Sequence, residues 1–257
     1  MSGAGCLIRA AEVLQAKKAE VALSVANIPI MRQTWSNIIW CHWPVEPSQV
    51  AAILPEGLEP DLYEGEAWVG LIPFSMHNLR FPGPFSVLTK LLRVSSFGEV
   101  NVRTYVIGPD GKSGVWFCTL DSDDWLAVKT ANIAFGLPYR FATTRFEQTH
   151  AIMNWTSQRK GDLARAELVI RKTSESSRDA LPGLEQFLVE RYALYTLRRG
   201  KLFRGRLKHA KWKVKSASLE RVVHETVNSE GISVVSGAHI LIGEPVEVTV
   251  YPLTRVR

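Results

Sequence analysis

The most informative segment of the chain is Phe97–Ala142, FGEVNVRTYVIGPDGKSGVWFCTLDSDDWLAVKTANIAFGLPYRFA. Near its start, Glu99, Asn101, Arg103 and Tyr105 alternate with residues that are mostly apolar. Successive side chains of a strand point to opposite faces, so this pattern predicts a strand with one apolar and one polar face. The polar face would suit either the solvent side of a sheet, with charge pairs between strands, or the inner wall of a ligand cavity.

A second strand is predicted at Val115–Leu120, after a glycine-rich turn at residues 108–114. Regular alternation would place Trp116, Cys118 and Leu120 on one face and Val115, Phe117 and Thr119 on the other. Both faces are then largely apolar, so we expect this strand to be buried on both sides.

A helix is predicted at Asp124–Phe135, because Ser and Asp residues precede it and favour a helix start. Gly136 suits the left-handed conformation that ends many helices, and Pro138 cannot continue one. Tyr139 and Arg140 would therefore emerge from a constrained turn.

The rest of the chain alternates short strand patterns with two short helical patterns. Strands are predicted at Ile38–Trp43, Ala67–Ser75, Ala151–Ser157, Leu163–Arg171, Ile232–Ile242 and Val246–Pro252, and helices at Pro47–Leu54 and Leu184–Leu197. Many strands with few helices predict an α+β domain dominated by antiparallel sheet.

The length and composition favour one large domain. The chain has 257 residues, enough for a substantial core, and its 8 Trp and 10 Phe indicate an aromatic interior. We expect a single domain at residues 33–257. Residues 1–32 would form an N-terminal appendage that is either helical, around Ala10–Ala26, or disordered.

Several features predict a cytoplasmic protein. No apolar run approaches the ~20 residues of a membrane helix, and the N-terminus carries no secretory signal pattern. The cysteines Cys6, Cys41 and Cys118 are too widely spaced for a metal motif or a disulfide framework.

Positive charge is concentrated in Arg198–Lys215, which contains no acidic residue in a chain of net charge +6. Such a segment could bind a polyanion or an acidic surface. However, Ala210, Trp212 and Val214 alternate with lysines, which predicts an amphipathic strand with a solvated basic face. No nucleic-acid motif accompanies it, so nucleic-acid binding is not expected.

Several separated stretches together resemble one family. They are Ile39–Leu58 (IWCHWPVEPSQVAAILPEGL), Gly65–Met76 (GEAWVGLIPFSM), Glu99–Ala142, Glu190–Tyr195 (ERYALY) and His209–Trp212 (HAKW). From Gln33 to Leu253 the chain is similar to the YqjF-like family of uncharacterised bacterial proteins, in the acetoacetate-decarboxylase-like superfamily. The resemblance implies an α+β fold in which an antiparallel sheet curls into a cone-like barrel around a ligand cavity, with a few outer helices.

The resemblance also implies a departure from the decarboxylases. Those enzymes end the equivalent helix with Gly-x-Pro-Lys-Lys, in which the first Lys forms a Schiff base and the second lowers its pKa. Here the turn is Gly136-Leu137-Pro138-Tyr139-Arg140, and a phenol cannot form an imine. Glu99 matches the position of an active-site glutamate, whereas residues 34–39 lack the arginine that the decarboxylases carry in their early strand.

We therefore predict a site at Tyr139, Arg140 and Glu99 that does not use Schiff-base chemistry. The Arg140 guanidinium would lower the pKa of the Tyr139 phenol, and Glu99 could relay a proton in enolisation, hydration or lyase chemistry. Tyr139 could equally contact a ligand without catalysis, or pack its ring for structural reasons. Further ligand contacts are predicted at Asn101, Arg103, Trp116, Arg159 and Tyr192.

No metal site and no cofactor are predicted. The six His residues are scattered and form no H-x-x-x-H or H-E-x-x-H pattern. Phosphate-binding glycine loops and a G-x-S-x-G nucleophile elbow are also missing from the sequence.

Three functions remain open at this point. The first is binding of a small carbonyl or carboxylate compound in the barrel, and the second is catalysis by Tyr139, Arg140 and Glu99. The third is interaction with a partner through the basic Arg198–Lys215 surface. The sequence leaves the identity of the ligand open, and a homo-oligomer is compatible with it.

Overall fold

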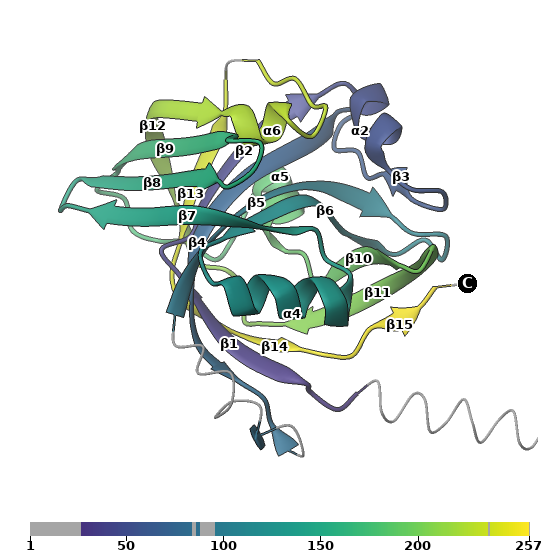
Figure 1. Ribbon diagram of the computed structural model, residues 1–257. Helices are drawn as coiled ribbons and strands as arrows, with labels where there is room; N and C mark the ends of the chain where they lie inside the picture. Colours follow the sequence, from purple (N-terminus) through teal and green to yellow (C-terminus); the bar gives the residue numbers. More distant parts are fainter. Residues whose placement is uncertain (1–26, 84–85, 88–95, 236, 257) are drawn as a thin grey trace, which may run out of the picture.

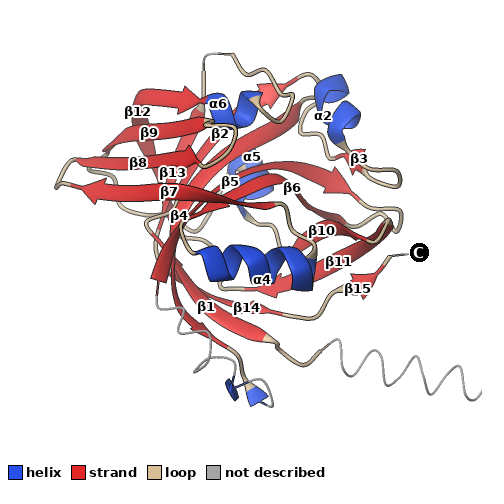
Figure 2. Cartoon of the chain, viewed as in Figure 1, coloured by secondary structure: helices blue, strands red, loops and turns tan. Residues whose placement is uncertain are grey.

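A computed structural model describes residues 27–83, 86–87, 96–235 and 237–256 (Figure 1). Strands dominate this part of the chain (Figure 2). The strands are β1 (Met31–Ser36), β2 (Ile39–Val45), β3 (Glu59–Pro60), β4 (Ala67–Arg80), β5 (Ser96–Ile107), β6 (Ser113–Ser122), β7 (Tyr139–Gln148), β8 (Ile152–Arg159), β9 (Arg165–Lys172), β10 (Ala193–Arg198), β11 (Lys201–Lys208), β12 (Val214–His224), β13 (His239–Gly243), β14 (Val246–Val250) and β15 (Thr254–Arg255). The helices are α2 (Pro47–Ile53), α4 (Trp125–Phe135), α5 (Gly183–Val189) and α6 (Glu225–Asn228).

The sheet closes on itself. Its hydrogen-bonded order is β1-β14-β11-β10-β6-β7-β8-β9-β12-β13-β2-β4, and β4 pairs with β1, so 12 strands form a ring. Most pairs are antiparallel, as predicted, but β6 runs parallel to both β7 and β10. Strand β5 pairs with β4 and with β6, so it spans the ring and divides its interior into two compartments.

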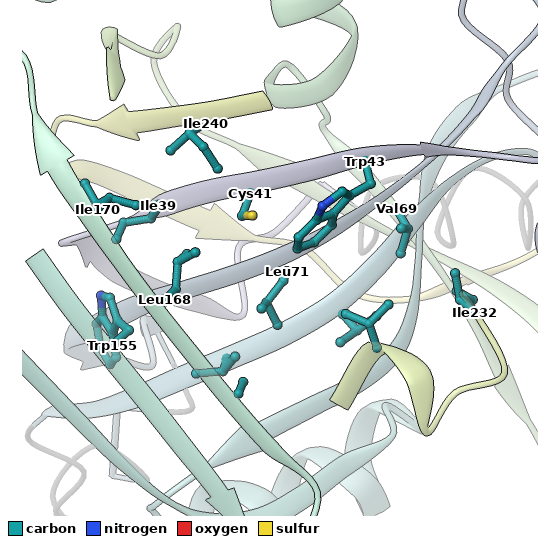
Figure 3. Packing of buried hydrophobic residues seen from close by; sticks show 14 of the residues in the cluster. Ile39, Cys41, Trp43, Val69, Leu71, Trp155, Leu168, Ile170, Ile232 and Ile240 are labelled. Carbon is teal, nitrogen blue, oxygen red and sulfur yellow. The ribbon is translucent and has the colours of Figure 1, made fainter. Parts of the chain in front are cut away.

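Each compartment has its own hydrophobic core. The first core includes Cys41 and Trp43 of β2 and Leu71 of β4, packed against strands β8 and β9 (Figure 3). The second core takes alternate residues of the same strands, such as Trp40 and Trp68, and packs them against α5 and β14. The two faces of β2, β4 and β5 are therefore both buried, which accounts for the aromatic and apolar richness of these segments.

The predicted helix at Leu184–Leu197 is wrong in its second half. Helix α5 ends at Val189, and Ala193–Arg198 forms β10 instead. The Arg191 side chain ends the helix, because its Nε donates to the Phe187 carbonyl at 2.6 Å and its Nη1 pairs with Asp61 at 2.6 Å. Pairing of β10 with β6 and β11 then overrides the helical periodicity of the sequence.

Two other local predictions need correction. A register shift in the β5–β6 pair inserts one extra residue near Cys118, so Phe117 lies opposite Arg103 while Thr119 lies opposite Val102. Strict alternation across Val115–Leu120 is therefore broken by a bulge. Similarly, Trp212 lies outside any strand, because its backbone N–H donates to the Glu190 carboxylate at 2.8 Å instead of to a neighbouring strand.

Other expectations on chain organisation fall partly outside the described residues. The proposed helix at Ala10–Ala26 is one of them. Strand β1 begins at Met31, two residues before the predicted domain start, and pairs with β14 and β4. Within the described ranges, no helix is long and apolar enough to cross a membrane.

Candidate functional site

The polar face of β5 is buried inside the second compartment. Glu99 is 2% exposed and Asn101 is 3% exposed, so the interpretation of this strand as a solvent-facing one is wrong. Tyr139 donates its phenolic proton to Glu99 Oε2 at 2.6 Å. Asn101 Nδ2 lies 3.4 Å from the other oxygen, Glu99 Oε1. Glu99 and Tyr139, which the sequence analysis assigned to one site, are thus in direct contact.

The backbone around Tyr139 is fixed by several hydrogen bonds. Asp124 caps α4 by accepting a hydrogen bond from the Ala127 amide at 2.7 Å, as expected for an N-cap. Gly136 ends the helix in the left-handed region, with φ of 66°. The Asn132 side chain then accepts from the Tyr139 N–H at 2.9 Å and donates to the Tyr139 carbonyl at 3.1 Å. The phenol is therefore presented to Glu99 from a constrained start of β7.

Burial changes the acidity of both partners. It raises the pKa of the Glu99 carboxyl from 4.5 to about 7, although the hydrogen bonds from Tyr139 and Asn101 act in the opposite direction. Burial and the neighbouring Glu99 raise the pKa of the Tyr139 phenol well above its usual value. The expected lowering of the Tyr139 pKa is therefore wrong. Near neutral pH, Tyr139 is a protonated donor and Glu99 is poised between its two protonation states.

Arg140 does not contribute to this pair, because adjacent residues of a strand point to opposite faces. Its guanidinium pairs with Asp162 at 3.0 Å and with Glu230 at 3.5 Å. Arg159 belongs to the same ion network: it is 1% exposed and its Nε donates to Asp121 at 2.7 Å. Arg140 and Arg159 are thus grouped together, away from Glu99 and Tyr139.

Arg103 and Tyr105 hold the end of α5. Both side chains donate to the Leu188 carbonyl, Arg103 Nη2 at 3.0 Å and Tyr105 at 2.8 Å. His42 Nε2 lies 2.6 Å from the Tyr105 hydroxyl, and burial lowers the pKa of this imidazole well below its usual value. Gly70 leaves room for the ring, since a Cβ there would lie 2.8 Å from two His42 atoms. Sequence reasoning did not include His42 or Gly70 in the site, although cross-strand pairing of a His with a Gly would have been the signal.

The last two predicted contacts lie elsewhere. Tyr192 is 38% exposed and stacks on His209, with 4.5 Å between ring centroids. Trp116 packs beside Tyr195 and lines a separate pocket. Of the predicted residues, the structure therefore brings together Glu99, Asn101 and Tyr139.

Several buried polar atoms next to this site lack a hydrogen-bond partner. They include Asn101 Oδ1, Arg103 Nε and His42 Nδ1. Buried polar atoms are normally paired, so these atoms mark positions where a ligand group or water would be stabilised. No described lysine is buried, and the described residues contain no cluster of three or more His, Cys, Asp or Glu able to hold a metal ion.

Comparisons with known proteins identify relatives of the chain. Residues 32–247 match DUF2071, a family described as an uncharacterized conserved protein. The chain is 36% identical over 208 residues to the uncharacterized protein YqjF of Bacillus subtilis (strain 168), covering 80% of this chain and 84% of YqjF.

The similar solved structures have the predicted fold. Acetoacetate decarboxylase from Legionella pneumophila subsp. pneumophila str. Philadelphia 1 aligns with a TM-score of 0.64 at 14% identity, over 90% of this chain and 88% of that one. The enduracididine biosynthesis enzyme MppR complexed with pyruvate aligns with a TM-score of 0.60 at 13% identity, over 89% and 91%. An acetoacetate decarboxylase-like enzyme from Sphingomonas wittichii RW1 aligns with a TM-score of 0.58 at 12% identity, over 90% and 94%. These likenesses confirm the fold.

Proposed function

Because this chain belongs to the DUF2071 family and has an acetoacetate-decarboxylase-like fold, we propose that it binds a small carbonyl or carboxylate compound beside Glu99, Asn101 and Tyr139 without forming an imine. The observation that carries the proposal is the 2.6 Å contact between the Tyr139 hydroxyl and the Glu99 carboxyl. The resemblance implies that Tyr139 and Glu99 stand at the positions of the Schiff-base lysine and the active-site glutamate of the decarboxylases.

The chemistry of the pair suits a ligand oxygen. Tyr139 is a fixed phenol donor, and a carboxyl group with a pKa of about 7 can donate when protonated and accept when ionised. The unpartnered Asn101 Oδ1 supplies a further acceptor. MppR, which has a similar fold, has been crystallised with pyruvate, so pyruvate is a reasonable first probe of this chain.

A second candidate function is proton transfer on such a ligand. A general acid or base works best when its pKa lies near the working pH, and the Glu99 pKa of about 7 meets this condition. Exchange of α-protons of a carbonyl compound with solvent deuterium, followed by NMR, measures this activity. Exchange that disappears in Glu99→Gln supports catalysis, whereas binding without exchange supports the first function alone.

Binding is tested by native mass spectrometry and calorimetry with pyruvate and longer 2-oxo and 3-oxo acids. We expect Tyr139→Phe and Glu99→Gln to weaken binding, and Tyr192→Phe, which removes a Tyr–Glu contact outside the site, to leave it unchanged. Borohydride treatment in the presence of the same compounds should yield no reduced adduct. A covalent adduct of imine mass, or equal binding by Tyr139→Phe and the unaltered protein, would overturn the proposal.

A further inference from the structure

A pocket lies at a gap in the sheet, on the edge of β6 that faces β7 and β10. Strand β6 pairs with β10 at Val115 and Trp116 and with β7 only from Leu120 onward. Between these two pairings is a pocket of about 310 Å³. Its lining comes from β6, β10, the turn before β7, the end of α2 and the turn after α6: Ile53, Trp116, Phe117, Cys118, Gly136, Pro138, Tyr195, Thr196, Leu197 and Glu230.

The apolar walls of this pocket are aromatic and held in place. Trp116, Phe117 and Tyr195 contribute three rings. Tyr195 is 1% exposed, donates its hydroxyl to the Lys112 carbonyl at 2.8 Å, and packs so closely on Gly114 that a Cβ there would lie 2.9 Å from the ring. Thr196 fixes the opposite wall by donating to the Gly136 carbonyl at 2.7 Å. The pocket is therefore formed before any ligand arrives.

The one acid among the lining residues is Glu230, and only part of its carboxylate is used. Arg159 Nη2 approaches Glu230 Oε1 at 3.2 Å and Arg140 Nη2 approaches the same oxygen at 3.5 Å. The contacts that the structure gives for Glu230 with Arg159, Arg140 and Ser229 all go to Oε1. The Glu230 charge also reaches the pocket interior, since it adds to the burial that raises the pKa of the Cys118 thiol to about 12.

The local charge balance is negative. Asp121, Asp162 and Glu230 contribute three carboxylates to the network, against the guanidinium groups of Arg140 and Arg159. Arg198 is not part of this network; its guanidinium lies over the Phe203 ring, 5.8 Å from the centroid. A cation entering the pocket would thus meet the Glu230 carboxylate and aromatic side chains, which both attract it.

We propose that this pocket binds a small organic amine with a flat apolar body. The protonated amine pairs with Glu230, and the body packs among Trp116, Phe117 and Leu197. A volume of about 310 Å³ accommodates a compound with one ring and a short side chain, and lies at the lower end of the range for ligand pockets, roughly 300–1,000 Å³. This site uses none of Glu99, Asn101 and Tyr139, the residues proposed to bind the carbonyl or carboxylate compound.

Three probes of nearly equal shape test the proposal: phenethylamine, 2-phenylethanol and 3-phenylpropionate. Calorimetry and saturation-transfer NMR should show phenethylamine binding about tenfold more tightly than the alcohol, a difference of about 1.4 kcal/mol. The carboxylate should bind most weakly. Equal or tighter binding of 3-phenylpropionate, or no binding of phenethylamine at millimolar concentration, would overturn the assignment.

Variants of the pocket residues test whether the amine binds in this pocket. Glu230→Gln should remove the preference for the amine over the alcohol, and Leu197→Trp should fill the pocket and abolish binding of both. Because Glu230→Gln could loosen the ion network, Arg140→Gln serves as a second test: removing a competing, 47% exposed cation should tighten amine binding. Weaker amine binding in a folded Arg140→Gln variant would contradict the proposal. Glu99→Gln should not alter amine binding, so the proposal for the amine pocket and the proposal for the Glu99 site can fail independently.

Discussion

Replacing Tyr139 by Phe removes the hydroxyl that donates to Glu99 Oε2 at 2.6 Å and leaves the ring in place. A hydrogen bond to an ionised group contributes about 1.5–3 kcal/mol, and one pH unit of pKa corresponds to about 1.4 kcal/mol. In this buried site the bond stabilises the ionised form of Glu99, so its loss should raise the Glu99 pKa. From about 7 in the unaltered protein, we expect a rise of roughly one to two pH units.

The assay is a pH titration by NMR of protein labelled with ¹³C at the glutamate carboxyl. The Glu99 signal is assigned as the one that disappears in Glu99→Gln. At pH 7 the ionised fraction of Glu99 should fall from about half to roughly a tenth or less. Tyr192→Phe, which removes a contact with Glu190 at a partly exposed position, should leave the Glu99 titration unchanged. A Glu99 pKa that stays constant or falls in Tyr139→Phe would refute the reasoning.

Three further predictions concern stability. The Glu99 pKa is raised on folding, so the contribution of the protonated Glu99 side chain to stability is fully present below pH 4.5 and is lost as pH rises to about 7. In urea denaturation, the free energy of unfolding should fall by about 3 kcal/mol over this range in the unaltered protein, but not in Glu99→Gln. Arg159→Met breaks a buried ion pair and should lower the free energy of unfolding by about 3–5 kcal/mol. Arg171→Met breaks an exposed pair and should lower it by less than about 1 kcal/mol; equal losses would show that burial does not matter here. Gly70→Ala should destabilise the fold by about 1–3 kcal/mol, because its Cβ would lie 2.8 Å from the His42 ring and 2.9 Å from Ile72 Cδ1; in thermal unfolding, the part of that cost due to the His42 ring should vanish in a His42→Ala background.

Local pattern was enough to predict the strands that carry the site. The alternation from Glu99 to Tyr105 fixes which side chains share a face, and helix-ending residues fix where Tyr139 enters its strand. These features depend on neighbours within a few residues, which a sequence displays directly. The resemblance to the decarboxylase superfamily added the long-range fold, including the closure of the sheet.

Features set by distant partners could not be predicted in this way. The bulge at Cys118 depends on how β6 fits between β5 on one edge and β7 and β10 on the other. The end of α5 depends on Arg191 reaching Asp61, 130 residues earlier in the chain. Neither feature leaves a local pattern in the sequence, so periodicity alone predicted a helix that continues past Val189 and a strand without a bulge at Cys118.

Tyr139 and Arg140 are adjacent in the sequence, but their side chains lie on opposite sides of one layer of the sheet. Neighbouring residues in a sequence suggest a shared site, but at the start of β7 they point to opposite faces, Tyr139 toward Glu99 and Arg140 toward Glu230. Because β5 and its partner β6 lie between the two compartments, each face of this layer carries its own polar system. The face toward the second compartment has a carboxyl group poised near neutrality, and the opposite face has the ion network that includes Glu230. Substitutions at these adjacent positions should therefore be interpreted separately.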